Sequence, residues 1–312
     1  MDLRHLSIDT RWMAWCQVFG EKAFIALPFF RGMGQVMLQE SALTGMLFFV
    51  GIICHSRVMA FGALIGLLTS TLAASALKYD REEIKKGLYG FNGALVGIAL
   101  CCFFKLNMAL IGLIVAGSFL TSPVMKWMFD RGWVPYTSPF LLVTWAFYFF
   151  IKLFRWIPLN ALLPAQGNEL DWSTSLFLGF GQVLFQPDLI TGIIFALAVL
   201  IHSRISALFA FWGALGGMLT ALCLSYPLGM VNSGLYGFNG VLCGIVFSGL
   251  RSKAWLFASL SIVLSVLMMN AMTRLHMIAL TGPFVFSTWL VMSLPALSGK
   301  FGRMRKLHRM QK

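Results

Sequence analysis

Long runs of apolar residues, separated by short polar breaks, follow one another along the chain. Clear examples occupy residues 46–54, 58–77, 189–201 and 255–272. None of these runs alternates apolar and polar positions as a half-buried strand does, and a chain inside lipid must satisfy its own backbone hydrogen bonds. The pattern therefore predicts membrane-spanning helices. At roughly twenty residues per span plus loops, the length allows about ten of them.

Composition supports the bilayer as the solvent of this chain. Of its 312 residues, 59% are hydrophobic and 11% are charged, which is more apolar surface than a soluble domain of this size can bury. The longest polar stretch, 155–175, contains two prolines and is typical of a linker, and the N-terminal segment lacks the pattern of a cleaved signal peptide. The six cysteines have no metal-ligand spacing, so we interpret them as small hydrophobic residues.

The net charge is +13; the tail 300–312 carries six basic residues and no acidic one, and no acidic residue follows Asp188. Basic segments beside spans usually face the cytoplasm and contact anionic lipid, so this pattern favours a cytoplasmic tail over nucleic-acid binding. Basic composition and short termini favour a bacterial inner membrane.

The chain contains the same unit twice. The heptapeptide GLYGFNG occupies 87–93 and again 234–240. Other motifs recur in the same order: GQV, HSR at the predicted ends of spans, and a TSPF or TGPF element. This order predicts a tandem duplication with a first repeat over 1–157, a linker over 158–173, a second repeat over 174–299 and a basic tail over 300–312.

Each half offers five clear spans plus the glycine-rich segment. An odd number of spans per unit forces the second copy to be inverted in the membrane. The glycine-rich start suits a helix that enters and stops, because irregular backbone at membrane depth must be buried or line a wet cavity. We therefore expect an all-α polytopic membrane protein of two inverted homologous repeats, each with about five transmembrane helices and one re-entrant half-helix.

Several polar, aromatic and aliphatic residues occupy equivalent places in both halves. Polar side chains inside apolar spans are costly and need a partner or a function. Structural roles compete with solute contact: the glycines allow close helix packing, the phenylalanines fill a core, the asparagines brace backbone, the glutamines bind neighbouring helices, and the threonines satisfy carbonyls freed by Pro139 and Pro283. The pairs are Gln35 and Gln182, Leu38 and Phe185, Phe91 and Phe238, Asn92 and Asn239, Leu95 and Leu242, and Thr137 and Thr281.

Nothing in the sequence resembles catalytic machinery, and we expect no enzyme activity, no cofactor and no metal. The five histidines lie at predicted ends of spans or in tails. A proton relay would need duplicated acids, but Glu40 corresponds to Pro187 and Asp188 to Ser41. These features favour a passive pore for a neutral solute.

The two GLYGFNG segments, each preceded by GQV and followed by a T-x-P-F element, resemble the urea transporter (urea channel) family over roughly residues 20–295. The family's signature reads L-P-x-x-T-x-P-F. Here the first copy, WVPYTSPF at 133–140, has its proline one place late, and the second, MIALTGPF at 277–284, lacks it. The departure falls on the turn before each threonine.

The resemblance implies a pseudo-symmetric protomer with its own pore, assembled as a homotrimer, with urea as substrate, membrane lipids around it and no nucleic acid. It also implies a flat slot with hydrogen-bond acceptors along its edge. By motif position, the slot walls are Phe91, Leu95, Phe238 and Leu242, with Leu38 and Phe185 at the mouths, Gln35 and Gln182 at the wider binding sites, and Thr137 and Thr281 at the constriction.

The sequence thus predicts passive, selective transport of urea and of close amide analogues. Three alternatives stay open. An ammonia channel would favour paired histidines inside spans, and a water channel would favour Asn-Pro-Ala at two half-helix starts; neither pattern is found. A membrane assembly protein without a pore would show no solute flux.

Overall fold

The computed structural model describes residues 21–160, 169–250 and 253–294. Their regular structure is helical, apart from an isolated antiparallel bridge between Phe104 and Leu159. The first half holds α2 (Glu21–Gln35), α3 (Ala42–His55), α4 (Arg57–Ala76), α5 (Arg81–Lys85), α6 (Gly90–Phe103), α7 (Met108–Asp130) and α8 (Ser138–Phe154). The second half holds α9 (Trp172–Gly181), the 3-10 turn η2 (Gln182–Leu184), α10 (Leu189–His202), α11 (Arg204–Cys223), α12 (Leu228–Asn232), α13 (Phe238–Phe247), α14 (Ala254–Arg274) and α15 (Gly282–Met292).

Four of these helices, α4, α7, α11 and α14, are long and apolar enough to cross a membrane. The segment from α9 to α10 makes a fifth if its two parts, bent by 77°, count as one broken span. Five further apolar helices have only 10–17 residues. The protein is thus an all-α, polytopic integral membrane protein. Many apolar runs are divided into short helices, so the long helices number fewer than the ten expected spans. Ten spans therefore stays a prediction.

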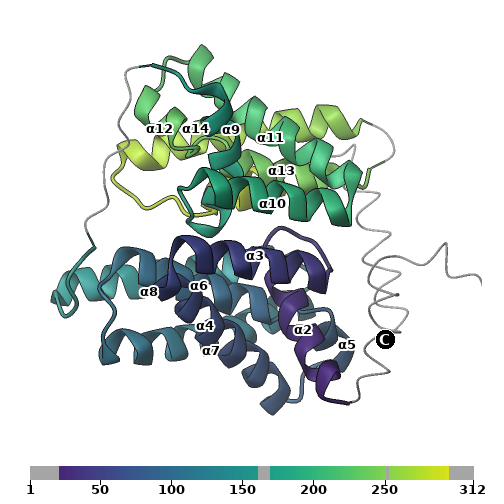
Figure 1. Cartoon of the computed structure of the whole chain (residues 1–312), viewed down its shortest axis with the longest axis vertical. Helices are drawn as coiled ribbons and strands as arrows, with labels where there is room; N and C mark the ends of the chain where they lie inside the picture. Colours follow the sequence, from purple (N-terminus) through teal and green to yellow (C-terminus); the bar gives the residue numbers. More distant parts are fainter. Residues whose placement is uncertain (1–20, 161–168, 251–252, 295–312) are drawn as a thin grey trace, which may run out of the picture.

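The two halves form two helical bundles that meet along α3 and α10 (Figure 1). The contacts there are reciprocal. The Thr44 hydroxyl donates to the Ala198 carbonyl at 3.2 Å, and the Thr191 hydroxyl donates to the Gly51 carbonyl at 3.3 Å. Each of these four residues is the counterpart of another in the duplicated sequence. Phe48 and Phe195, themselves counterparts, pack edge to face with centroids 5.0 Å apart.

The repeated HSR motif forms a tight junction between consecutive helices. Its serine caps the second helix in both copies: the Ser56 hydroxyl accepts the Met59 N–H at 3.3 Å, and the Ser203 hydroxyl accepts the Ser206 N–H at 3.2 Å. A serine at this position satisfies one of the free N–H groups at a helix start. The serine of the motif is therefore a helix cap in both halves.

Glycines bring the short, buried helices α6 and α13 against α4 and α11. A Cβ added at Gly97 would lie 1.9 Å from the Gly62 carbonyl oxygen, and one added at Gly240 would lie 2.2 Å from the Gly213 carbonyl oxygen. Such approach is possible only without side chains, as is usual where helices pack inside membranes. Close packing is therefore a real function of the repeated glycines.

Candidate functional site

The two GLYGFNG segments lead into α6 and α13. These helices have 14 and 10 residues, and at 1.5 Å per residue neither reaches the roughly 30 Å thickness of a bilayer core. Nearly all of their residues are buried. Their lengths suit the predicted half-helices, and whether they are re-entrant stays a prediction.

Asn92, on the first turn of α6, bridges two backbone groups of the turn that precedes α8. Its side-chain oxygen accepts the Phe140 N–H at 3.1 Å, and its side-chain nitrogen donates to the Tyr136 carbonyl at 3.4 Å. These two groups lie on either side of Thr137. Asn92 is fully buried and therefore braces backbone, the role that the sequence favoured for it.

Asn239 repeats this arrangement in the second half. Its oxygen accepts the Phe284 N–H at 3.1 Å, and its nitrogen donates to the Leu280 carbonyl at 3.4 Å. The bonded groups again lie on either side of a threonine, Thr281. We call the two asparagines, with the backbone groups they bond, the asparagine clamps.

The turns held by the clamps share an uncommon backbone. Tyr136 and Leu280, directly before the threonines, have φ of 48° and 49°. A left-handed conformation costs a residue other than glycine roughly 1–3 kcal/mol and persists only where its surroundings enforce it. The threonines also match, with φ and ψ of −95° and 13° for Thr137 and −91° and 14° for Thr281. The differing prolines therefore leave the turn geometry unchanged.

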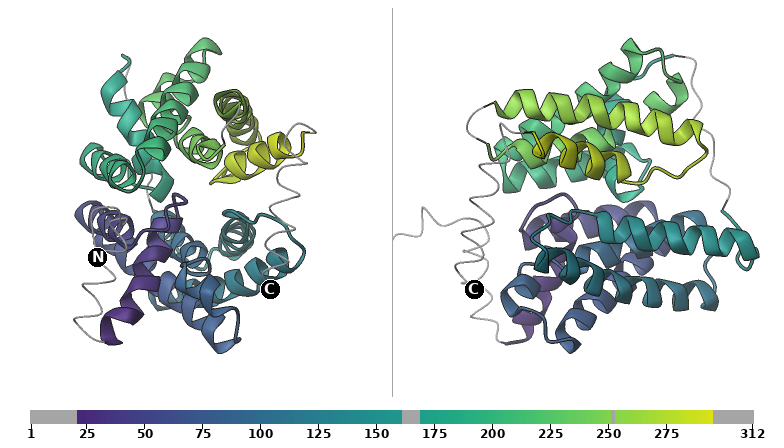
Figure 2. Two further views of the ribbon diagram at one scale, coloured as in Figure 1. Left: turned by 90° about the vertical axis from the view of Figure 1, so that its right-hand side faces the viewer. Right: turned by 180° about the vertical axis from the view of Figure 1, so that it is seen from behind.

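The clamped turns bring the two threonines together between the halves. The Thr137 and Thr281 hydroxyl oxygens are 2.7 Å apart, and both residues are buried. They immediately precede α8 and α15, which face each other across the two bundles (Figure 2). Among the described residues, the hydroxyls bond each other and no carbonyl freed by Pro139 or Pro283.

One tryptophan from each half binds the turn of the opposite half. The Trp145 indole on α8 donates to the Ile278 carbonyl at 2.7 Å, and the Trp289 indole on α15 donates to the Val134 carbonyl at 2.8 Å. Sequence reasoning missed these residues, although TW recurs at a constant distance after both T-x-P-F elements. That recurrence was a usable signal.

The glutamines of the GQV motifs bind the segments just before the glycine-rich heptapeptides. The Gln35 amide nitrogen donates to the Lys86 carbonyl at 2.9 Å, and the Gln182 amide nitrogen donates to the Ser233 carbonyl at 2.9 Å. Both glutamines thus bind neighbouring backbone, one of the structural roles considered for them. Their amide oxygens have no hydrogen-bond partner among the described residues and stay available as acceptors.

Leu38 and Phe185 each follow the bend after their glutamine, with φ of 59° and 60°. The Phe185 ring crosses into the first half, where its centroid lies 5.9 Å from that of Phe103 and 6.4 Å from that of Phe140. Phe140 is also the residue whose N–H the clamp holds. This places Phe185 beside the threonine turn, with leucine at the equivalent position of the other half.

The remaining predicted wall residues lie one helical turn apart on α6 and α13. All are buried in one continuous apolar core, with exposed fractions between 0% and 6%. Burial of this kind is shared by ordinary core residues, so their contact with solute stays a prediction. These residues are Phe91, Leu95, Phe238 and Leu242.

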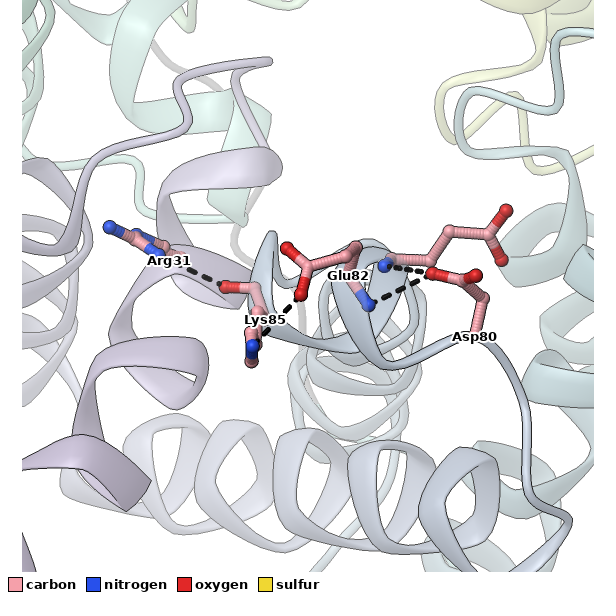
Figure 3. A network of polar contacts seen from close by, with 5 residues as sticks. Arg31, Asp80, Glu82 and Lys85 are labelled. Atoms are coloured by element: carbon pink, nitrogen blue, oxygen red, sulfur yellow. Dashed lines mark hydrogen bonds and ion pairs between the residues drawn. The ribbon is translucent and has the colours of Figure 1, made fainter. Parts of the chain in front are cut away.

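The segment before the first heptapeptide carries a charged network that sequence reasoning did not assign (Figure 3). Arg31, one turn before Gln35 on α2, donates to the Lys85 carbonyl at 3.3 Å. The Lys85 ammonium pairs with Glu82 at 2.8 Å, and Asp80 accepts the Glu82 N–H at 2.9 Å. An arginine within the helix that carries Gln35 was the available signal.

A model of the urea transporter family matches residues 27–295 of this chain. The chain belongs to the urea transporter family. It is similar to Urea transporter 1 of Rattus norvegicus and to that of Mus musculus, each 28% identical over 299 residues, covering 88% of this chain and 78% of the relative. Urea transporter 1 of Ovis aries is 27% identical over 289 residues, covering 85% and 75%. Urea transporters move solute and are not enzymes, and both asparagine clamps lie in the matched region.

Proposed function

We propose that this protein transports urea passively across the membrane, along a pathway within each protomer that passes the threonine pair. The observation that carries the proposal is the buried contact of 2.7 Å between Thr137 and Thr281, the two residues for which the family resemblance implies a constriction. Close amide analogues of urea share its planar shape and enter the same proposal.

The hydroxyl pair suits the hydrogen bonding of urea. Two hydroxyls have two donors and four lone pairs, and their mutual bond uses one of each. One donor and three lone pairs are left. Urea offers one carbonyl acceptor and several N–H donors, all of which lose water in a narrow apolar passage. The free amide oxygens of Gln35 and Gln182 would accept its N–H groups at the two mouths.

Apolar walls would receive the flat faces of the solute. We propose Phe91 and Leu95 from one half and Phe238 and Leu242 from the other as these walls, with Leu38 and Phe185 at the mouths. All the proposed contact residues are neutral, so a charged solute would lose its water without a compensating charge. Weak acceptors in a row allow a solute to leave as easily as it enters, which conduction requires.

The proposal includes two inverted repeats, over 1–157 and 174–299, joined by a linker over 158–173. Two contacts support it: Thr137 meets its own counterpart, and so does Phe48. Contacts between counterparts are expected where a two-fold axis passes. The assembly we propose is a homotrimer in a bacterial inner membrane with a cytoplasmic C-terminal tail; residues 300–312 lie outside the described part of the chain.

Urea efflux from proteoliposomes, measured by stopped-flow light scattering, tests the function. We expect faster efflux than from empty liposomes, unchanged when a proton gradient is collapsed. Loss of flux on collapse would indicate a coupled carrier. Fast water or ammonia flux without urea flux would favour the other channel classes, and no flux of any solute would favour an assembly protein.

A further inference from the structure

Among the duplicated polar residues, the two asparagines have no assigned part in transport. We propose that Asn92 and Asn239 are positioning residues that hold the threonine pair in register and so determine how well the constriction passes urea. This inference rests on the proposed function, because it presumes that solute passes the threonines.

The clamps act on the backbone on both sides of each threonine. Asn92 holds the carbonyl of the residue before Thr137 and the N–H three residues after it, and Asn239 holds the same two groups around Thr281. The lengths agree between the halves, at 3.4 Å and 3.1 Å in each. A threonine whose flanking groups are both fixed cannot rotate its turn without breaking these bonds.

The clamped carbonyl belongs to a strained residue in each half. Tyr136 and Leu280 have the left-handed backbone described above, and neither is a glycine. Without the clamp, such a residue would relax toward an ordinary conformation and turn the peptide that leads into the threonine. A hydroxyl contact of 2.7 Å between separate turns tolerates little rotation, so both clamps are needed to keep it.

A purely structural role is the competing explanation, and Asn160 offers a matched control for it. The Asn160 amide nitrogen donates to the carbonyls of Cys101, Cys102 and Phe104 at 3.0–3.1 Å, where it closes the C-terminal end of α6. It is thus an asparagine that braces backbone of the same helix, with no hydrogen bond to the threonine turns. Removing it should weaken the fold without altering the threonine pair.

The test is a set of double-mutant cycles on urea permeability in proteoliposomes. Asn92→Ala and Asn239→Ala are made in the wild-type chain and in a Thr137→Val, Thr281→Val background. In the wild-type chain we expect each to lower urea permeability about tenfold, equivalent to ~1.4 kcal/mol. In the valine background, where no hydroxyls remain to be positioned, we expect a change below about twofold. Asn160→Ala should have the same effect in both backgrounds.

A second measurement does not depend on transport. In a chain carrying Thr137→Cys and Thr281→Cys, mild oxidation should link the two sites, because a disulfide needs its side chains in close and defined geometry. Adding Asn92→Ala or Asn239→Ala should reduce the linked fraction severalfold, and adding Asn160→Ala should not.

Equal effects of the clamp variants in both backgrounds, or unchanged cross-linking, would overturn the inference. A third outcome would also overturn it: the alanine variants fail to assemble, but Asn92→Ser and Asn239→Ser, which retain only a short hydroxyl, behave as wild type in both measurements. Absence of urea flux in the wild-type protein would instead overturn the proposed function. The two failures are therefore distinguishable.

Discussion

Removing the hydroxyls of Thr137 and Thr281 should change the stability of the protein and its urea permeability in different ways. Thr137→Val alone leaves the buried Thr281 hydroxyl without its partner at 2.7 Å, and Thr281→Val alone leaves the Thr137 hydroxyl without its partner. An unsatisfied buried polar group costs about 1–3 kcal/mol, whereas replacing both partners with apolar groups of the same shape is nearly neutral. We therefore expect both single variants to unfold at lower temperature and the double variant to unfold close to wild type.

Transport should follow the number of hydroxyls removed. Two hydrogen bonds between solute and the pair, at about 1 kcal/mol each, amount to ~2 kcal/mol at the constriction. Since every 1.4 kcal/mol corresponds to a factor of ten, the double variant should pass urea about 30-fold more slowly than wild type. The double variant would thus be more stable than either single variant and yet pass urea more slowly. Misfolding does not produce this combination.

The assay combines thermal unfolding in detergent with stopped-flow urea efflux from liposomes of equal protein content. Thr44→Val is the matched control, since its hydroxyl also bonds between the halves but lies on α3, away from the threonine turns. It should cost about 1 kcal/mol of stability and leave urea permeability unchanged. Unchanged flux in the double valine variant would place the constriction elsewhere. A double variant as unstable as the two single losses added together would mean that the hydroxyls are not a pair.

Three further predictions concern the frame around the site. Gly87→Ala should prevent correct assembly, because φ is +76° there and a Cβ would lie 2.3 Å from a backbone nitrogen of α2, whereas Gly112→Ala, in open space, should fold normally by size-exclusion chromatography. Trp289→Phe should lower the free energy of unfolding by about 1 kcal/mol through loss of its bond to the opposite half, measured by denaturant titration. Hydrogen bonds from Thr174 lower the pKa of Asp171, the N-cap of α9. The ionised carboxylate therefore stabilises the fold fully above the unfolded pKa of about 3.9, and this stabilisation is lost as pH falls through the lower folded pKa. The difference in melting temperature between wild type and Asp171→Ala should shrink over that pH range.

The duplication and the helical class could be predicted because both follow from short stretches of the sequence. Apolar runs without alternation indicate helices in lipid, and GLYGFNG recurs with its neighbours in order. The same recurrence singled out the residues that the structure brings together. Asn92 and Asn239 were expected to brace backbone, and they do.

What could not be predicted depends on which segments meet in space. Composition and periodicity do not reveal that Thr137 contacts Thr281, 144 positions away, and only the family resemblance implied a shared constriction. Nothing in the sequence indicated that the Phe185 ring enters the other half. The number of spans was hard to predict for a related reason. Hydropathy records that a run is apolar, but not that a bend of 77° divides it, as between α9 and α10.

Comparing equivalent residues in the two halves helps to distinguish groups that contact solute from groups that stabilise the fold. Both halves have a glutamine bonded to the carbonyl before a glycine with positive φ, but Arg31 in the first half corresponds to Leu178 in the second. The Lys85 and Glu82 pair beside Arg31 is solvent-exposed and contributes at most about 1 kcal/mol. If solute passes both glutamines, as we propose, equivalent polar groups are expected to contact it in both halves. The glutamine recurs, whereas Lys85 corresponds to Asn232 and Glu82 to Gly229. This supports the proposal that the glutamines contact solute and that the charges of the first half fasten α5.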